Sequence, residues 1–225
     1  MPGPQYLLWI DLETTGTDLA QDRILEIGAI VTDSDLNEEE HYHGIVRLTP
    51  DEPDATISDP VVRNMHTRNG LLDDCLTSPY AKPLHEHAAP LVELVTPYLN
   101  PKITLAGSGV SHFDRRFLDE WFPRLTERLN YWSVDVGVVR RFLRDIAGIE
   151  VTGRVPREKR HRALDDIEDH LAEARNISEY LQMLHRLSTE PYSARSLADI
   201  AGSLDTIAGV LEANVSVAGF RVDTR

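Results

Sequence analysis

The sequence predicts an α/β protein with a central mixed sheet of about five strands, helices on both of its faces and a C-terminal extension. Three strand-like apolar runs follow one another through short connections, and strand-like and helical patterns alternate afterwards. The 225 residues are 41% hydrophobic, which is enough for one substantial core. We therefore expect one domain over residues 1–187, with residues 188–225 packing on it as an extension.

The first three strands are expected over residues 7–12, 23–33 and 43–49, where apolar residues run between turn-forming stretches. Residues 33–40 are acidic and polar, and are expected to form an exposed hairpin between the second and third strands. Because only short connections join the three strands, an antiparallel meander is the simplest arrangement.

The later elements follow from changes of hydrophobic period and from turn residues. Asp59 followed by Pro60 predicts the start of a short helix with the aspartate as N-cap. Pro123 is expected to interrupt a helical pattern. In chain order, we expect helices over residues 84–99, 114–129, 136–146 and 163–187, strands over 103–107 and 131–135, a basic polar loop over 154–162, weak helices over 195–213 and a final strand over 215–222.

Composition limits the classes of function. The chain carries 23 Lys and Arg against 37 Asp and Glu, a net charge of −14, which disfavours tracking along duplexes but permits a short nucleic-acid strand held by metals. The single cysteine, Cys75, excludes an intramolecular disulfide and fits a reducing, cytoplasmic setting. No apolar run approaches the roughly 20 residues of a membrane helix, and the first residues lack a secretion-signal pattern, so we expect no membrane partner.

Two acidic residues stand at the end of the first predicted strand, in the Trp-Ile-Asp-Leu-Glu-Thr-Thr-Gly run of residues 9–16. Because side chains alternate along a strand, Asp11 and Glu13 project from the same side of it. Two neighbouring carboxylates stay ionised only when a positive charge compensates them, and a divalent cation is the simplest compensator. The turn that follows places the pair at the carboxyl end of the strand, where open α/β sheets usually carry their sites.

Three further polar residues suggest chemistry, although each also has an ordinary structural explanation. Asp114 opens a predicted helix, where it would also fit an N-cap. Asp165 and Asp166 lie in the first turn of the helix over 163–187, where acidic residues are favoured. His161 precedes Asp166 by five residues, in the basic loop. Because long stretches of chain separate these residues from the first acidic pair, their convergence is a prediction about the fold.

The order of these motifs resembles the DEDDh superfamily of 3'-to-5' exonucleases, and within it the oligoribonucleases. The matching motifs are Asp-x-Glu on the first strand, Phe-Asp-Arg-Arg-Phe-Leu at the head of a helix and His-x-Ala-x-Asp-Asp before the long helix. With their supporting stretches, they cover roughly residues 5–185 in the right order. The resemblance implies a ribonuclease H-like sheet and a hydrolase that cleaves phosphodiester bonds.

The resemblance also implies a role for each residue. Four carboxylates would hold two divalent ions, Mg²⁺ or Mn²⁺, which prefer oxygen ligands and support phosphodiester hydrolysis as a pair. His161, with an unperturbed pKa of about 6.5, would be the general base. The implied metal ligands are Asp11, Glu13, Asp114 and Asp166, and substrate contacts are expected from Thr14, Gly16, His66, Tyr131, Trp132, Arg157 and Arg160.

One local alternative stays open at this point. Residues four apart share a helix face, whereas residues five apart differ by about 140°, so helix geometry pairs His161 with Asp165 and the family pattern pairs it with Asp166. The conflict disappears if His161 lies in the loop before the helix, as we expect. Apart from His66, the other histidines, including His87, are expected at the surface.

The chain departs from the oligoribonuclease pattern around the expected substrate. Thr17 replaces an apolar residue that wedges against the terminal base, and Gly137 replaces a hydroxyl-bearing residue. Val61 and Trp132 stand where an aromatic and a basic residue are usual. In that family the residue matching Tyr131 comes from the partner subunit, so the resemblance implies a homodimer. The basic loop is either a solvated loop or a surface that steers phosphates.

We therefore expect a metal-dependent 3'-to-5' exoribonuclease that degrades short single-stranded oligoribonucleotides to nucleoside 5'-monophosphates. A general single-stranded DNA or RNA exonuclease, as in the proofreading relatives, is the alternative with the same chemistry. A non-catalytic nucleic-acid-binding module on the same fold is an alternative of another class, and metal-dependent turnover would exclude it. A hydrolase of small phosphate esters would act on mononucleotide esters but not on oligomers.

Overall fold

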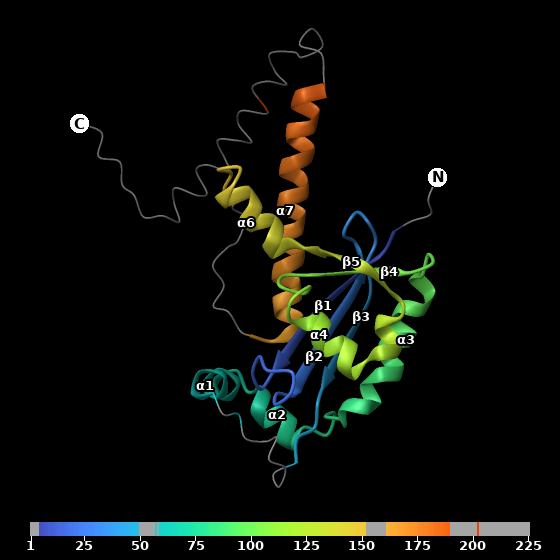
Figure 1. The fold of residues 1–225 in the computed structure, drawn as a ribbon, viewed down its shortest axis with the longest axis vertical. Helices are drawn as coiled ribbons and strands as arrows, with labels where there is room; N and C mark the ends of the chain where they lie inside the picture. The colour runs from blue at the N-terminus through green and yellow to red at the C-terminus, as the bar shows by residue number, and fades with distance from the viewer. Residues whose placement is uncertain (1–4, 50–56, 58, 152–160, 190–201, 203–225) are drawn as a thin grey trace, which may run out of the picture.

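The computed structural model describes residues 5–49, 57, 59–151, 161–189 and 202. A five-stranded mixed sheet stands between two layers of helices, which confirms the predicted α/β fold (Figure 1). Within the described ranges, no helix combines the length and hydrophobicity that crossing a membrane requires. The expected elements of the tail beyond residue 189, and nearly all of the basic loop, lie outside the described residues.

The sheet has the order β3-β2-β1-β4-β5. Strands β1, β2 and β3 form antiparallel pairs, which confirms the predicted meander, whereas β1 pairs with β4 and β4 with β5 in parallel. Strand β1 continues past the end of its pairing with β4, so its carboxyl end is open on that side. The bounds are β1 (Leu7–Thr14), β2 (Ile24–Thr32), β3 (Glu38–Ile45), β4 (Ile103–Gly107) and β5 (Leu129–Asp135).

Strand β3 begins earlier than predicted because the connection before it is a tight turn. The Asp33 carboxylate accepts hydrogen bonds from the backbone N–H groups of Asp35 and Asn37 and from the Asn37 side chain. Leu36 adopts a left-handed φ of 63° in this turn. The acidic residues 38–40 therefore join an edge strand, whose outer side faces solvent and tolerates charge.

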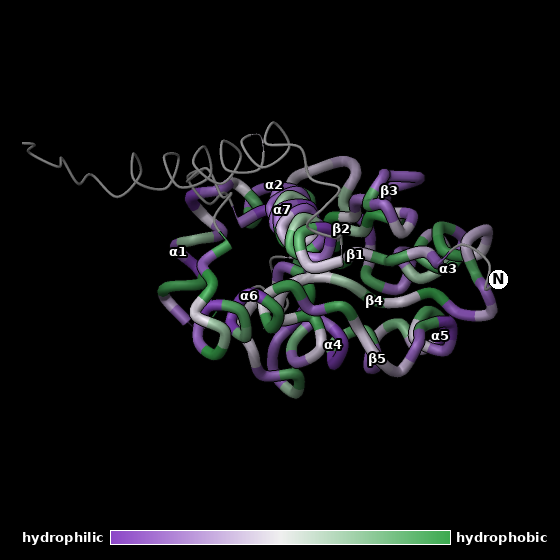
Figure 2. The backbone as a smooth tube through the Cα atoms, turned by 90° about the horizontal axis from the view of Figure 1, so that it is seen from above, coloured by the Kyte–Doolittle hydropathy of each residue, from purple (hydrophilic) through white to green (hydrophobic). Residues whose placement is uncertain are grey.

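The helices lie on both faces of the sheet and at one of its ends (Figure 2). Helices α3, α4 and α5 cover one face, α7 covers the other, and α1 and α2 lie near the carboxyl end of β1. Helix α7 continues well past the sheet (Figure 1). The bounds are α1 (Pro60–Arg68), α2 (Leu71–Thr77), η2 (Leu84–His87), α3 (Ala88–Val95), η3 (Thr96–Tyr98), α4 (Asp114–Trp121), α5 (Pro123–Thr126), α6 (Val136–Asp145) and α7 (Ala163–Thr189).

Alternation along β1 divides the core between the two faces. Leu8, Ile10 and Leu12 pack into the layer with α3, α4 and α5. Trp9 points the other way and packs with Ile167 of α7. Because Asp11 and Glu13 share the side of Trp9, the candidate ligands face the helix that begins just after His161.

Within the described ranges the helix predictions hold with two differences, and the prediction for one histidine is wrong. The helix expected over residues 84–99 is divided into η2, α3 and η3, with Pro97 in the first turn of η3. Helix α2 is not predicted by the sequence; it buries Leu71 and Cys75 in a small core, where burial raises the pKa of the Cys75 thiol to about 12. The expectation for His87 is wrong, because its ring is buried beneath β3 and hydrogen-bonds the Tyr42 hydroxyl at 2.6 Å.

Candidate active site

The carboxyl end of β1 supplies the first two carboxylates. Glu13 is buried and Asp11 is half-buried. In the β1–β2 ladder Asp11 lies opposite Gly28, and Glu13 lies opposite a second buried glutamate, Glu26. The acidic pair predicted from the alternation of the strand therefore lies on the face of the sheet that α7 covers.

The start of α7 brings a third carboxylate and an imidazole to Glu13. Ligand atoms of Glu13, His161 and Asp166 all lie within 4.8 Å of one another, and Asp165 is not part of this group. Helix α7 begins at Ala163, so His161 lies in the preceding loop, where it adopts a left-handed φ of 49°. The loop position removes the restriction of helix geometry, and Asp166 rather than Asp165 stands beside His161.

Asp114 reaches the same strand from the other side. It opens α4, is buried, and its Oδ1 accepts a hydrogen bond from the backbone N–H of Leu12 at 2.9 Å. Burial raises the pKa of Asp114 to about 7 despite this hydrogen bond, and the charge of Asp135 raises it further. A metal-free Asp114 thus retains its proton well above the ordinary range of aspartate. Its carboxylate is tied to the residue between Asp11 and Glu13, although it lies outside the group of three.

His66 is a buried support for the end of β1. Its Nε2 donates a hydrogen bond to the Thr14 carbonyl at 3.0 Å and lies 3.9 Å from Oε2 of Glu13. Burial lowers the pKa of His66, against the effect of the Thr14 hydrogen bond, and the ring is neutral at pH 7. The Thr14 hydroxyl in turn donates to the Gly16 carbonyl at 2.6 Å. Thr14 and Gly16 thus form a turn beside Glu13, which His66 contacts from α1. The contact of these three residues with substrate stays a prediction.

The remaining predicted substrate residues do not join this cluster within the described chain. Tyr131 is 88% exposed and Trp132 is 52% exposed, and their rings make an edge-to-face pair on the outermost strand, β5. Arg157 and Arg160 lie outside the described residues.

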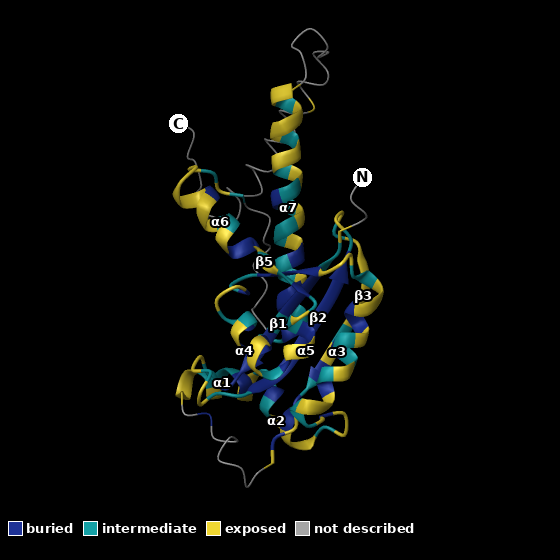
Figure 3. Ribbon diagram, turned by 45° about the vertical axis from the view of Figure 1, so that its right-hand side comes forward, coloured by how far each residue is buried: buried dark blue, intermediate teal, exposed yellow. Residues whose placement is uncertain are grey.

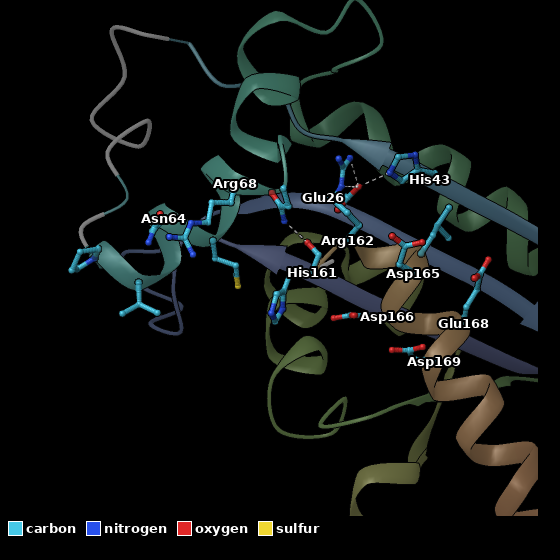
Figure 4. A pocket seen from close by; sticks show the side chains of 15 residues that line it. Glu26, His43, Asn64, Arg68, His161, Arg162, Asp165, Asp166, Glu168 and Asp169 are labelled. Carbon is cyan, nitrogen blue, oxygen red and sulfur yellow. Dashed lines mark hydrogen bonds and ion pairs between the residues drawn. The ribbon is translucent and has the colours of Figure 1, made fainter. Parts of the chain in front are cut away.

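A groove runs from the carboxylates between α1 and α7 (Figure 4). Its volume is about 1560 Å³. Val61, Asn64 and Arg68 line it from α1, and His161 and Asp166 line it at the head of α7. The exposed Val61 side chain and the Arg68 guanidinium therefore stand at the same opening as the candidate base.

The prediction missed a network of charged side chains behind His161. Arg162 and His43 both bond Glu26 (Figure 4). Arg162 also pairs with Asp74. A glutamate inside the apolar run of β2 was the available signal, because a buried carboxylate requires partners.

Ser108 was missed as well. A Cβ at Gly137 would lie only 2.5 Å from the Ser108 Oγ, so this hydroxyl occupies the space of the absent side chain.

Comparisons with known proteins agree with this arrangement. The model of the exonuclease family RNase_T matches residues 8–174. The chain is 34% identical to the oligoribonuclease of Mycobacterium bovis over 201 residues, covering 87% of this chain and 86% of that one. It is 32% identical to the mitochondrial oligoribonuclease of Bos taurus over 173 residues, covering 75% and 70%.

Solved structures of exonuclease I share the fold. A zinc-bound complex of E. coli exonuclease I with single-stranded DNA superposes with a TM-score of 0.61, and exonuclease I from Methylocaldum szegediense with a TM-score of 0.60. Both are 20% identical to this chain, and each match covers 81% of it. The chain spans only 42% of the length of each exonuclease I. The likeness shows that the ribonuclease H-like fold predicted from the motifs is correct.

Proposed function

This chain belongs to the RNase_T exonuclease family and is a 3'-to-5' exonuclease, and on that premise we propose that it shortens single-stranded RNA oligomers of a few nucleotides to nucleoside 5'-monophosphates. Glu13 lies near the start of the described domain, and His161 and Asp166 lie near its end, yet their ligand atoms are within 4.8 Å of one another. This convergence is the observation that carries the proposal. The relatives named oligoribonuclease support RNA as the substrate class.

The acidic residues fit hard divalent cations. Glu13 and Asp166 supply carboxylate oxygens within one small volume, Asp11 faces the same side of β1, and Asp114 is bonded to the backbone between them. Such oxygens are the ligands that Mg²⁺ and Mn²⁺ prefer, so we propose that these four residues hold two of these ions. When bound, the ions make the attacking nucleophile more reactive and neutralise charge on the phosphorus and the leaving oxygen.

His161 is the proposed general base. Its loop position leaves the side chain half-exposed while its imidazole lies beside the carboxylates of Glu13 and Asp166. From there Nδ1 or Nε2 can take the proton of the water that attacks the terminal phosphodiester.

The groove between α1 and α7 suits a single strand better than a duplex. Val61 offers an apolar contact at its edge, and Arg68 offers a cation for a phosphate. The basic loop that ends at Arg162 is proposed to attract the anionic substrate to an otherwise acidic protein.

We also propose that the chain acts as a homodimer in which Tyr131 and Trp132 reach the partner's groove. Support comes from an exposed apolar face on the outermost strand and the adjoining helix, which Figure 3 shows as largely exposed around α6. We call this surface the β5–α6 face; it consists of Tyr131, Trp132, Val134, Val138, Phe142 and Ile146, all exposed. Several exposed apolar side chains on one strand and the helix that follows it are typical of an interface between copies. The cytoplasmic setting stays a prediction.

A time course with 5'-labelled oligomers of two to about twenty nucleotides in Mn²⁺ tests the proposal, with RNA and DNA compared. Stepwise loss of 3' nucleotides, fastest on the shortest RNA, is the expected result, and Asp11→Ala serves as the inactive control. Equal trimming of long RNA or DNA would replace the proposal with a general exonuclease. Cleavage of mononucleotide esters alone would indicate the small-ester hydrolase, and binding without any shortening would indicate a non-catalytic module.

A further inference from the structure

Glu26 is a buried carboxylate beside the candidate ligands. It lies within β2 among apolar residues, with an exposed fraction of 1%. Because it pairs with Glu13 in the antiparallel ladder, both side chains stand on the same face of the sheet. A second carboxylate next to a metal ligand is costly to bury, so its retention calls for an explanation.

The partners of Glu26 satisfy its charge. Arg162 donates from Nε to Oε1 at 3.0 Å and to Oε2 at 3.1 Å, and from Nη2 to Oε1 at 2.8 Å. The backbone N–H of Ala163 donates to Oε2 at 3.0 Å, and His43 Nε2 lies 2.6 Å from Oε1. Burial alone would raise the pKa of Glu26, but the hydrogen bonds from His43, Arg162 and Ala163 together lower it. Glu26 is therefore ionised at pH 7 and is bonded to three residues.

These bonds act on the segment that carries His161 and Asp166. Arg162 follows His161 directly, and the Ala163 N–H is the first of α7, which no residue of the helix itself can satisfy. The Arg162 carbonyl accepts the Asp166 N–H at 2.9 Å. Holding Arg162 and Ala163 on β2 therefore fixes both the imidazole and the carboxylate.

A second anchor holds the other side of the same turn. The Asn69 side chain donates to the His161 carbonyl at 2.6 Å, and Arg162 Nη1 donates to Asp74 Oδ2 at 2.9 Å. Figure 4 shows the interactions of Glu26 and the bond to the His161 backbone converging behind the groove. A left-handed residue such as His161 is maintained only where its surroundings fix the backbone.

We propose that Glu26 is a positioning residue for the hydrolysis: through Arg162 and the first N–H of α7 it sets His161 and Asp166 against Glu13. This inference rests on the proposed function, because it assigns work to the proposed base and ligand. It predicts that the chemical step depends on a side chain of the groove wall through its hydrogen bonds to Arg162 and Ala163.

Glu26→Gln tests the inference, since the amide keeps the size of the side chain but cannot accept hydrogen bonds from all four donor groups. At saturating Mn²⁺ we expect kcat for RNA oligomers to fall about 10- to 100-fold, as for other groups that orient metal ligands, with KM changed by less than about threefold. In a His161→Ala background the same substitution should lower kcat by a smaller factor than in the parent, because one of the two groups it positions is gone. Equal losses in both backgrounds would overturn the inference.

Helix α7, whose first residues Glu26 holds, also offers a matched control. Arg140 donates to both carboxylate oxygens of Glu173 at 2.8 Å, joining α6 to α7 away from the groove. Glu173→Gln removes an arginine–glutamate ion pair in which both carboxylate oxygens are bonded, as they are in Glu26. The variant should leave kcat within about twofold of the parent, whatever it does to the melting temperature. A fall in kcat as large as that of Glu26→Gln would show that any loosening of α7 is sufficient, and would overturn the specific role.

Two further measurements keep the outcome clear. If Glu26→Gln does not fold, Asn69→Ser removes the donor to the His161 carbonyl while keeping an oxygen near the Leu71 N–H, and kcat should again fall with little change in KM. Mn²⁺ binding by calorimetry should weaken about tenfold in Glu26→Gln. If the parent hydrolyses no oligomer, the proposed function fails while this binding difference still decides the positioning role; equal Mn²⁺ affinity, or none in the parent, overturns it.

Discussion

The carboxyl end of β1 and the β5–α6 face are opposites in chemistry. At the first, carboxylates and an imidazole converge from β1 and the head of α7, and the Asp114 carboxylate of α4 is bonded to the β1 backbone. At the second, aromatic and aliphatic side chains such as Phe142 and Ile146 face solvent. The contrast underlies our proposal that one chain supplies the candidate metal ligands and base, and that a second copy completes substrate binding.

The largest expected effect tests the proposed metal ligands at the carboxyl end of β1. Asp166→Asn should reduce kcat about a thousandfold or more, because a ligand to the proposed cations is worth several kcal/mol in the transition state. Asp165→Asn is the control, since Asp165 stands outside the group of three. Rates on a short RNA in Mn²⁺ measure both. Loss of activity in the control but not in Asp166→Asn would reverse the assignment.

The next effect concerns the raised pKa of Asp114. In the unfolded chain this group ionises near the ordinary value of 3.8, whereas in the metal-free fold its pKa is about 7. Its contribution to stability is therefore fully present at acid pH and is lost as the pH rises to about 7, a decrease of about 2–4 kcal/mol.

Urea unfolding of the metal-free protein between pH 4 and pH 8 measures this loss. Asp114→Asn, which keeps an oxygen for the Leu12 N–H, should show a weaker pH dependence, and saturating Mn²⁺ should restore the stability of the parent at pH 8. An identical pH dependence in parent and variant would remove Asp114 as its source.

The β5–α6 face is tested by placing charge on it. Phe142→Glu combined with Ile146→Glu should convert a dimer into a folded monomer, as measured by light scattering and circular dichroism. If the partner supplies base stacking, worth about 1–3 kcal/mol, kcat/KM on the shortest RNA should fall about 5- to 150-fold. Arg144→Ala, an exposed change on the same helix, is the control. A parent that is already monomeric and fully active would show that the β5–α6 face is not needed for substrate binding.

The smallest effect belongs to three side chains of the basic loop that lie outside the described residues. Replacing Arg157, Lys159 and Arg160 by glutamine should raise KM a few-fold and flatten its dependence on salt, because long-range attraction of phosphates acts mainly on binding. Unchanged kinetics between low and high salt would leave this loop as a solvated connection.

The sequence predicts the sheet and the reaction centre better than it predicts their supports. Alternation along β1 was sufficient to place Asp11 and Glu13 on one face, and the motif before α7 was sufficient to select Asp166. The network around Glu26 depends on contacts between β2 and the head of α7, which no local period reports. The early start of β3 was missed because charged residues on an edge strand resemble a loop.

Gly28 bears on how inactivating variants of this protein should be read. A Cβ there would lie 2.8 Å from the carbonyl carbon of Ala163 and 3.0 Å from the side chain of Ile167, so even alanine would press the head of α7 away from β2. A genetic screen for loss of function should accordingly recover Gly28 alongside the carboxylates, although it carries no functional group. Such a variant would be misread as a folding defect unless its thermal stability were measured separately from its activity.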